Sequence, residues 1–157
     1  KLKTKKDPNK HKLIKILGPE PLGNKFNGEY LFKKSRKKSL PVKNFIMDSK
    51  IVVGVGNIYA NEALFMAGIR PTKKSGLISK IKFEELSRSI VITLREAIEA
   101  GGTTLKDYTN AEEAPGYFKK ELKVYDRGGE NCFKCSKKLK EIRQANRQTV
   151  YCSNCQN

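Results

Sequence analysis

The sequence has no long apolar run, few acidic residues and only four cysteines. No stretch approaches the roughly 20 apolar residues that a membrane-spanning helix needs. The first residues, KLKTKKDPNKHK, also lack the apolar segment of a secretion signal. These absences argue against a membrane protein and against a secreted one, so we expect a cytoplasmic location.

Acidic residues are the scarce charged class: 16 Asp and Glu stand against 33 Lys and Arg, and the net charge is +17 over 157 residues. Such a field favours polyanionic partners. Because 38% of the residues are hydrophobic, the chain can fold around a modest core, which indicates a globular nucleic-acid binder rather than a disordered basic tail. An anionic membrane surface is the weaker alternative.

Apolar residues recur at helical spacing in four segments before residue 102. We expect a short helix around Phe26 and Tyr30, a second that begins at Pro41, a third within 57–71 and the longest within 82–102. Beyond these segments GGTTLKDYTNAEEAPG is polar and turn-rich, and YFKKELKVYDRGG is either a short helix or a strand that leads to the cysteines. The chain therefore divides into a helical part and a small cysteine-containing part.

The cysteines form the pattern C-x2-C-x16-C-x2-C, made by Cys132, Cys135, Cys152 and Cys155. Each CxxC turns two thiolates toward one point, and two such turns supply the tetrahedral sulfur set that zinc prefers. Two disulfides are the alternative, but nothing in the sequence indicates secretion. The pattern predicts one bound zinc ion.

The residues between the cysteine pairs predict a β-hairpin, with LKEI leading out and QTVYC returning. Few apolar residues are available for its core, so the metal would supply much of its stability. The expected loop, KEIRQANRQT, carries Arg143, Asn146, Arg147 and Gln148, which suit phosphates and bases. Ordinary polar turn residues are the alternative interpretation.

The stretch KIVVGVGNIYANEALF places Gly54 and Gly56 before a helix that begins at Asn57. Glycine allows the backbone to approach another molecule closely, and the N-terminus of a helix suits a phosphate. On its own, this pattern is also typical of a simple packing turn.

Five blocks occur in order: LGPEPL, VGVGNIYANEALF, GGTTLKDY, PGYFKKELKVY and the cysteine module ending in CQ. Together they resemble the C-terminal part of bacterial formamidopyrimidine-DNA glycosylase, a base-excision repair family that acts on oxidised purines. The resemblance extends from about residue 15 to the end of the chain. Endonuclease VIII shares the layout, but GGTTLKDY with PGYF is closer to the purine enzyme.

The resemblance implies a mainly α fold with a small β-hairpin zinc module. We expect a basic arm or linker at 1–16, a helix-two-turn-helix DNA-binding domain with the start of a lesion loop at 17–110, and a connector with a C-terminal zinc finger at 111–157. The family's N-terminal β-sandwich domain, which carries a catalytic Pro-Glu pair, is expected to be absent from this chain.

By resemblance, Lys43 and Asn57 contact the phosphates that flank the damaged nucleotide. Arg147 matches the finger arginine that grips a phosphate and donates a proton in δ-elimination. Tyr125 resembles a support behind the site, with a plain core role as an equal alternative. Part of the loop that closes over an everted purine is matched by Thr103, Thr104, Leu105, Lys106, Asp107 and Tyr108.

Two positions depart from the family pattern. Asp126 stands where the family usually has glycine, which places an acid near a phosphate-binding surface. Ser39 stands where a lysine is common, although Lys37 and Lys38 are adjacent and could compensate.

We therefore expect the damaged-DNA binding half of a glycosylase and abasic-site lyase that removes formamidopyrimidine and 8-oxoguanine from duplex DNA, acting as a monomer away from membranes. Without the Pro-Glu pair the chain alone is expected to bind DNA without cleaving it, although the sequence does not decide whether it is an enzyme. The alternatives are a free-standing zinc ribbon that binds RNA or the ribosome, and a structural zinc domain that binds protein. The zinc ribbon does not explain GVGN and GGTTLKDY, and the net charge of +17 argues against the protein-binding domain.

Overall fold

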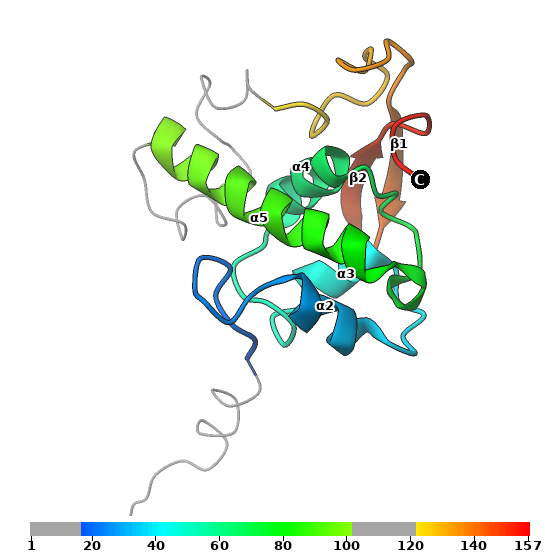
Figure 1. The fold of residues 1–157 in the computed structure, drawn as a ribbon. Coiled ribbons are helices and arrows are strands. Elements are labelled where there is room, and N and C mark those ends of the chain that lie inside the picture. Colours follow the sequence, from blue (N-terminus) through cyan, green and yellow to red (C-terminus); the bar gives the residue numbers. More distant parts are fainter. Residues whose placement is uncertain (1–16, 102–121) are drawn as a thin grey trace, which may run out of the picture.

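The computed structural model describes residues 17–101 and 122–157 (Figure 1). Within these residues the fold is mainly helical, with one two-stranded antiparallel sheet near the C-terminus. The predicted fold class is confirmed. The expected basic arm at 1–16 and the expected lesion-loop residues 103–108 lie outside the described residues.

All four predicted helical segments are helices. Their bounds, with one 3-10 turn, are α2 (Gly28–Ser35), α3 (Val42–Met47), α4 (Asn57–Ala67), η1 (Ser75–Leu77) and α5 (Lys80–Gly101). The Asn27 side chain caps α2 by accepting a hydrogen bond from the Tyr30 amide at 2.8 Å. Gly68 ends α4 with a left-handed φ of 75°, a conformation that glycine adopts without strain.

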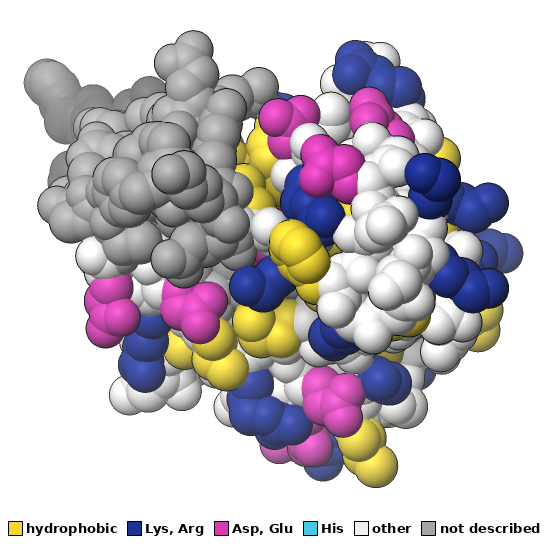
Figure 2. All heavy atoms as spheres, turned by 90° about the horizontal axis from the view of Figure 1, so that it is seen from above, with side chains coloured by type: hydrophobic (Ala, Val, Ile, Leu, Met, Phe, Trp, Pro, Cys, Tyr) yellow, Lys and Arg dark blue, Asp and Glu magenta, His cyan; other side chains and the backbone are white. Residues whose placement is uncertain are grey.

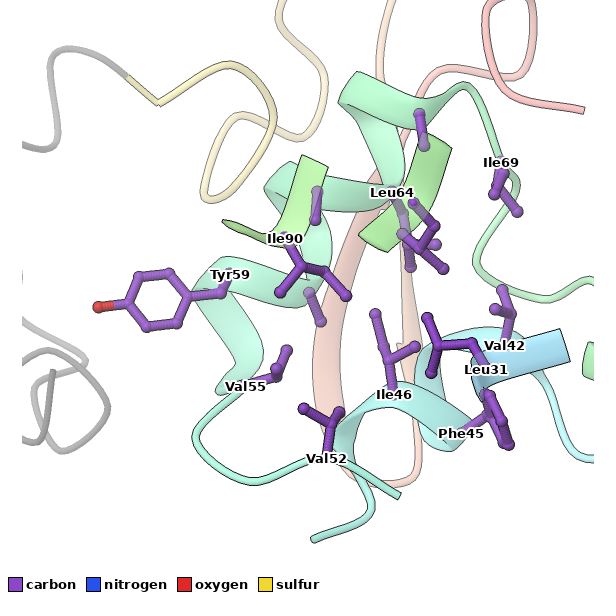
Figure 3. Close-up of a cluster of buried hydrophobic side chains, with 14 of the residues drawn as sticks. Leu31, Val42, Phe45, Ile46, Val52, Val55, Tyr59, Leu64, Ile69 and Ile90 are labelled. Carbon is purple, nitrogen blue, oxygen red and sulfur yellow. The ribbon is translucent and has the colours of Figure 1, made fainter. Parts of the chain in front are cut away.

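The main core lies where α5 crosses α2 and α4, with α3 packed beneath α4. Figure 3 shows side chains from these helices directed into one shared interior. A Cβ on Gly28 would lie 2.4 Å from the Glu84 Cα atom, so the close contact between α2 and α5 requires glycine there. The fully buried side chains include Leu31, Phe45, Ile46, Leu64, Phe83, Leu86, Ile90 and Leu94.

The predicted hairpin is formed by β1 (Lys140–Gln144) and β2 (Arg147–Tyr151). Its turn holds only two residues, Ala145 and Asn146, with left-handed φ values of 52° and 63°. Such turns match the twist of the strands, so the strands pair up to the tip. The expected ten-residue loop was therefore too long, because Arg143, Arg147 and Gln148 lie in strands.

A second, smaller core lies under the hairpin. It joins Leu139 and Val150 to Phe65, which α4 supplies, and to Val124 from the connector. The cysteine-containing part is therefore not self-contained, because it borrows apolar area from the helices. No helix in 17–101 or 122–157 is long and apolar enough to cross a membrane.

Candidate nucleic-acid interface and metal centre

The backbone carbonyl of Gln148 in β2 is the point where the helical part meets the hairpin. It accepts hydrogen bonds from Asn57 Nδ2 at 3.0 Å and from Lys43 Nζ at 3.3 Å. Asn61 Nδ2 lies 3.4 Å from the same oxygen. Arg147 is the preceding residue on β2, so all three predicted DNA-binding residues, Lys43, Asn57 and Arg147, come together although they are up to 104 positions apart.

Lys43 is buried between the helical part and the hairpin rather than exposed on the surface. Its residue is 2% exposed, and its ammonium also donates to Thr149 Oγ1 at 2.7 Å. Burial, assisted by the nearby positive charge of Arg147, lowers the pKa of Lys43 to about 8. A buried ammonium beside a second cation is a site that an anion would stabilise.

A hollow of about 270 Å³ opens between α3 and the hairpin turn. Lys43 and the exposed Arg147 both line it, together with Asn44 and Gln144. The Gln144 side chain donates to Asn44 Oδ1 and to the Pro71 carbonyl, both at 3.1 Å. The tip of the hairpin is thus held against α3, and two cationic side chains face one small space.

The N-terminus of α4 lies beside the same carbonyl. Gly54 adopts a left-handed φ of 84°, and Gly56 is the N-cap, so no side chain caps the helix. The positive end of the helix dipole is therefore left to other partners. Asn57 Oδ1 is buried and accepts no hydrogen bond from the described residues.

Asn61 is a contact residue that sequence reasoning missed. Its Oδ1 accepts the Val150 amide at 2.8 Å while its Nδ2 approaches the Gln148 carbonyl, so one side-chain amide bonds the open edge of β2 as a neighbouring strand would. It also donates to the Asn57 carbonyl at 2.8 Å. The spacing of four residues from Asn57 was the signal available in the sequence.

Glu62, the next residue, was also missed. Its carboxylate is 7% exposed and accepts three consecutive amides, from Lys123 at 2.8 Å, Val124 at 2.9 Å and Tyr125 at 2.8 Å. Burial raises the pKa of Glu62, and the three hydrogen bonds act in the opposite direction. Residues 123–125, which connect the undescribed segment to the hairpin, are therefore held against α4 by Glu62; we call these three hydrogen bonds the Glu62 clasp. Tyr125 itself is 9% exposed and belongs to the main core.

Asp126 has a left-handed φ of 64°, and its amide donates to Gln148 Oε1 at 3.1 Å. A left-handed φ favours glycine, and Asp tolerates it better than most residues do. The conformation therefore explains why glycine suits this position and why Asp is a workable replacement.

The four cysteines form one cluster, in which all Sγ atoms lie within 4.8 Å of one another. Cys135 Sγ lies 3.4 Å from Cys152 Sγ, and Cys132 Sγ lies 3.9 Å from Cys155 Sγ. A tetrahedral site with metal–sulfur bonds of about 2.3 Å places its sulfurs about 3.8 Å apart. The geometry therefore fits a metal ion.

The cysteine cluster also favours ionised sulfur at one position. A hydrogen bond from the Lys137 backbone amide is the main cause that lowers the pKa of Cys135 to about 6, and this favours the thiolate.

The C-terminal end of the cluster is anchored to the loop after α4. The Gln156 side chain is fully buried, accepts the Cys152 amide at 2.8 Å and donates to the Ile69 carbonyl at 2.9 Å. Arg70 Nη2 donates to the Ser153 carbonyl at 2.8 Å. The cluster and the helices are thus held in one relative position.

Lys and Arg side chains are spread over the face shown in Figure 2, where acidic side chains are fewer. This distribution agrees with the net charge of +17. The electrostatic field outside the molecule is therefore attractive to a polyanion.

Comparison with known proteins identifies relatives. The sequence profile of the formamidopyrimidine-DNA glycosylase H2TH domain matches residues 17–109. Formamidopyrimidine-DNA glycosylase from Marinomonas sp. (strain MWYL1) is 56% identical over 98% of this chain, and that from Idiomarina loihiensis is 55% identical over 99%. The chain spans only 56% and 57% of the lengths of these two relatives.

Solved structures give the same family. The MutM (Fpg) protein from Thermus thermophilus superposes with a TM-score of 0.80 and 34% identity, covering 96% of this chain and 57% of that one. Lactococcus lactis Fpg in complex with DNA containing an abasic site gives a TM-score of 0.79 and 32% identity, covering 96% and 55%. This chain belongs to the formamidopyrimidine-DNA glycosylase family.

Proposed function

We propose that this chain binds duplex DNA carrying an abasic site or an oxidised purine, as the DNA-binding half of a repair glycosylase and abasic-site lyase. The observation that carries the proposal is the convergence of Lys43 and Asn57 on the Gln148 carbonyl, directly beside Arg147. The relatives are repair glycosylases, and one solved relative holds abasic-site DNA.

Each residue has a chemical role toward phosphate. The Asn57 amide nitrogen carries two hydrogens, so its bond to Gln148 leaves a second donor next to the uncapped end of α4. Arg147 offers a guanidinium fork for a neighbouring phosphate. The buried ammonium of Lys43 adds charge behind both.

The remaining roles follow from the family. By that resemblance we propose Arg147 as the proton donor of the δ-elimination step and Tyr125 as a support of the site. The part of the chain that matches the family's lesion loop is Thr103, Thr104, Leu105, Lys106, Asp107 and Tyr108. The family's amine nucleophile and its glutamate belong to an N-terminal domain, and this chain spans only 56% and 57% of the two relatives' lengths.

We propose zinc as the metal of the cysteine cluster, held by Cys132, Cys135, Cys152 and Cys155. Four thiolates at tetrahedral spacing suit zinc, and its contribution is structural, because no coordination position is left for a substrate. The ion would hold the ends of the hairpin together, while α4 positions its outer edge through Asn61. The proposal also includes the expected division of the chain into a basic arm or linker (1–16), a DNA-binding domain (17–110) and a connector with a zinc finger (111–157).

Binding selectivity tests the proposal. The zinc-loaded chain is titrated against three ligands: an abasic-site duplex, an undamaged duplex of the same sequence and a structured RNA, each over a range of salt concentrations. We expect the tightest binding to the abasic duplex, with a log–log salt slope that corresponds to a few phosphate contacts. Equal affinity for all three would instead support a generic nucleic-acid module.

A further inference from the structure

Two short backbone segments on the edge of the helical part run antiparallel to each other. Val42 N donates to the Lys73 carbonyl at 2.7 Å, Ser75 N to the Leu40 carbonyl at 2.8 Å, and Gly76 N to the Lys38 carbonyl at 2.9 Å. We call residues 37–42 and 73–76 the lysine ribbon. Its hydrogen bonds join the segment after α2 to the segment before α5.

Four exposed lysines project from the ribbon: Lys37, Lys38, Lys73 and Lys74. The sequence has no Asp or Glu between residues 30 and 47 or between 63 and 83. None of the four forms an ion pair with the described residues. Lys37 has a left-handed φ of 68°, which is uncommon for lysine. The ribbon is thus a cationic patch without acidic side chains on its own two segments.

The ribbon is continuous with the proposed DNA site. The Pro71 carbonyl accepts the Lys43 amide at 3.2 Å and, from the hairpin tip, Gln144 Nε2 at 3.1 Å. Lys73 follows Pro71 by two residues and bonds the first residue of α3. A DNA strand whose phosphate occupies the hollow between α3 and the hairpin, and which continues past Pro71, would reach the lysines of the ribbon with its following phosphates.

We propose that the lysine ribbon is an accessory binding surface for the phosphates of undamaged duplex beside the lesion. This inference rests on the proposed function, which supplies the nearby duplex. Phosphate contacts from lysine carry no sequence information, so this surface adds affinity and salt dependence but no preference for damage. It also explains how the chain tolerates Ser39, because four other lysines surround that position.

An acidic protein partner is the competing occupant, because Leu77 beside the ribbon is 71% exposed. The ribbon's continuity with the DNA site favours the duplex. On the duplex interpretation Leu77 has no role, so Leu77→Ser should leave DNA binding unchanged.

The test compares charge-matched double variants of the full chain. Lys73→Gln/Lys74→Gln and Lys37→Gln/Lys38→Gln each remove two ribbon charges. The control, Lys33→Gln/Lys80→Gln, removes two lysine charges that lie near Glu29. Binding is measured on a long abasic duplex and on one trimmed to a few base pairs beside the lesion, with the salt slope recorded for each.

On the long duplex we expect each ribbon variant to lower the salt slope by about one to two and the affinity several-fold, while the control changes both by less. On the trimmed duplex the ribbon variants should match wild type. Equal effects of ribbon and control variants, equal losses on both duplexes, or a larger loss from Leu77→Ser would overturn the inference. The ratio of abasic to undamaged affinity separates this result from the proposed function, because that ratio depends on the primary site and not on the ribbon.

Discussion

The two parts of the molecule are stabilised in different ways. The helical part buries large side chains from four helices in one core. The aliphatic side chains that the hairpin part buries are Leu139 and Val150, and its small core also depends on Phe65 from α4 and on the cysteine cluster. The first part therefore has a core of its own, whereas the second needs both a ligand and a neighbour. The proposed DNA site lies where these two unequal parts meet.

Metal removal should separate the two parts most clearly. A structural zinc site contributes on the order of 10 kcal/mol to the folding of a small module. We expect chelation, or Cys135→Ser, to abolish selective binding of abasic DNA while the helical circular-dichroism signal is retained. The control is Ser136→Gly, an exposed position whose left-handed φ of 70° glycine adopts without strain. Loss of the helical signal together with binding would show that the helices depend on the metal as well.

The Glu62 clasp should show the next largest effect. Glu62→Gln keeps the size of the side chain but replaces one carboxylate oxygen with a donor, so at least one buried connector amide loses its acceptor. Such a loss costs about 1–3 kcal/mol. Urea denaturation measures it, with Glu29→Gln, an exposed carboxylate paired with Lys33, as the control. Equal stability of the two variants would mean that the clasp is dispensable.

The primary phosphate contacts should each be worth about tenfold in affinity for the abasic duplex, the size expected for a charge-assisted hydrogen bond. Asn57→Ala and Arg147→Ala are the informative changes. The first removes a donor from α4 and the second removes a donor from β2, on the two sides of the contact between the helical part and the hairpin. Arg143→Ala removes the same charge from the opposite strand and should cost less. If circular dichroism shows that Asn57→Ala or Arg147→Ala unfolds, the residue is structural.

The pH dependence of Lys43 gives a smaller effect. Its pKa is about 8 in the folded chain, below the ordinary value of 10.5, so the unfolded chain holds more protons between these values. Stability relative to Lys43→Met should therefore increase as pH rises through this window and be lowest below about 8. DNA affinity should fall over the same rise in pH, because the ammonium loses its charge. Parallel pH profiles for wild type and Lys43→Met would contradict this assignment.

The smallest predicted change concerns Asp126. Asp126→Gly and Asp126→Ala both remove the negative charge, but only glycine adopts a φ of 64° freely. We expect the Gly variant to be more stable than the Ala variant by about 1 kcal/mol in thermal unfolding. Both should bind DNA slightly more tightly than wild type, and a more stable Ala variant would argue against the backbone explanation.

Much of the fold was predictable because it depends on local patterns. Apolar spacing located all four helices, and the cysteine spacing located the hairpin. The length of the loop was misjudged because two non-glycine residues, Ala145 and Asn146, adopt left-handed φ in the turn. Nothing in QANR distinguishes that turn from a longer loop.

The contacts between the two parts were harder to predict because they join residues far apart in the chain. Asn61 and Glu62 resemble ordinary polar positions of α4, yet both face the C-terminal part. The burial of Lys43 was also not evident, since lysine side chains are mostly exposed to solvent. Such roles depend on tertiary packing, which periodicity does not report.

The central claim is that α4 and the hairpin form one DNA-binding site, and amide hydrogen exchange in these two elements tests it most directly. The amides at the start of α4 and those of β2 are followed in the zinc-loaded chain with and without an abasic duplex, and again after chelation. We expect the duplex to protect both segments together and chelation to remove that joint protection. Protection of one segment alone, or joint protection that survives without metal, would contradict the claim that a metal-held hairpin and α4 form a single DNA-binding site.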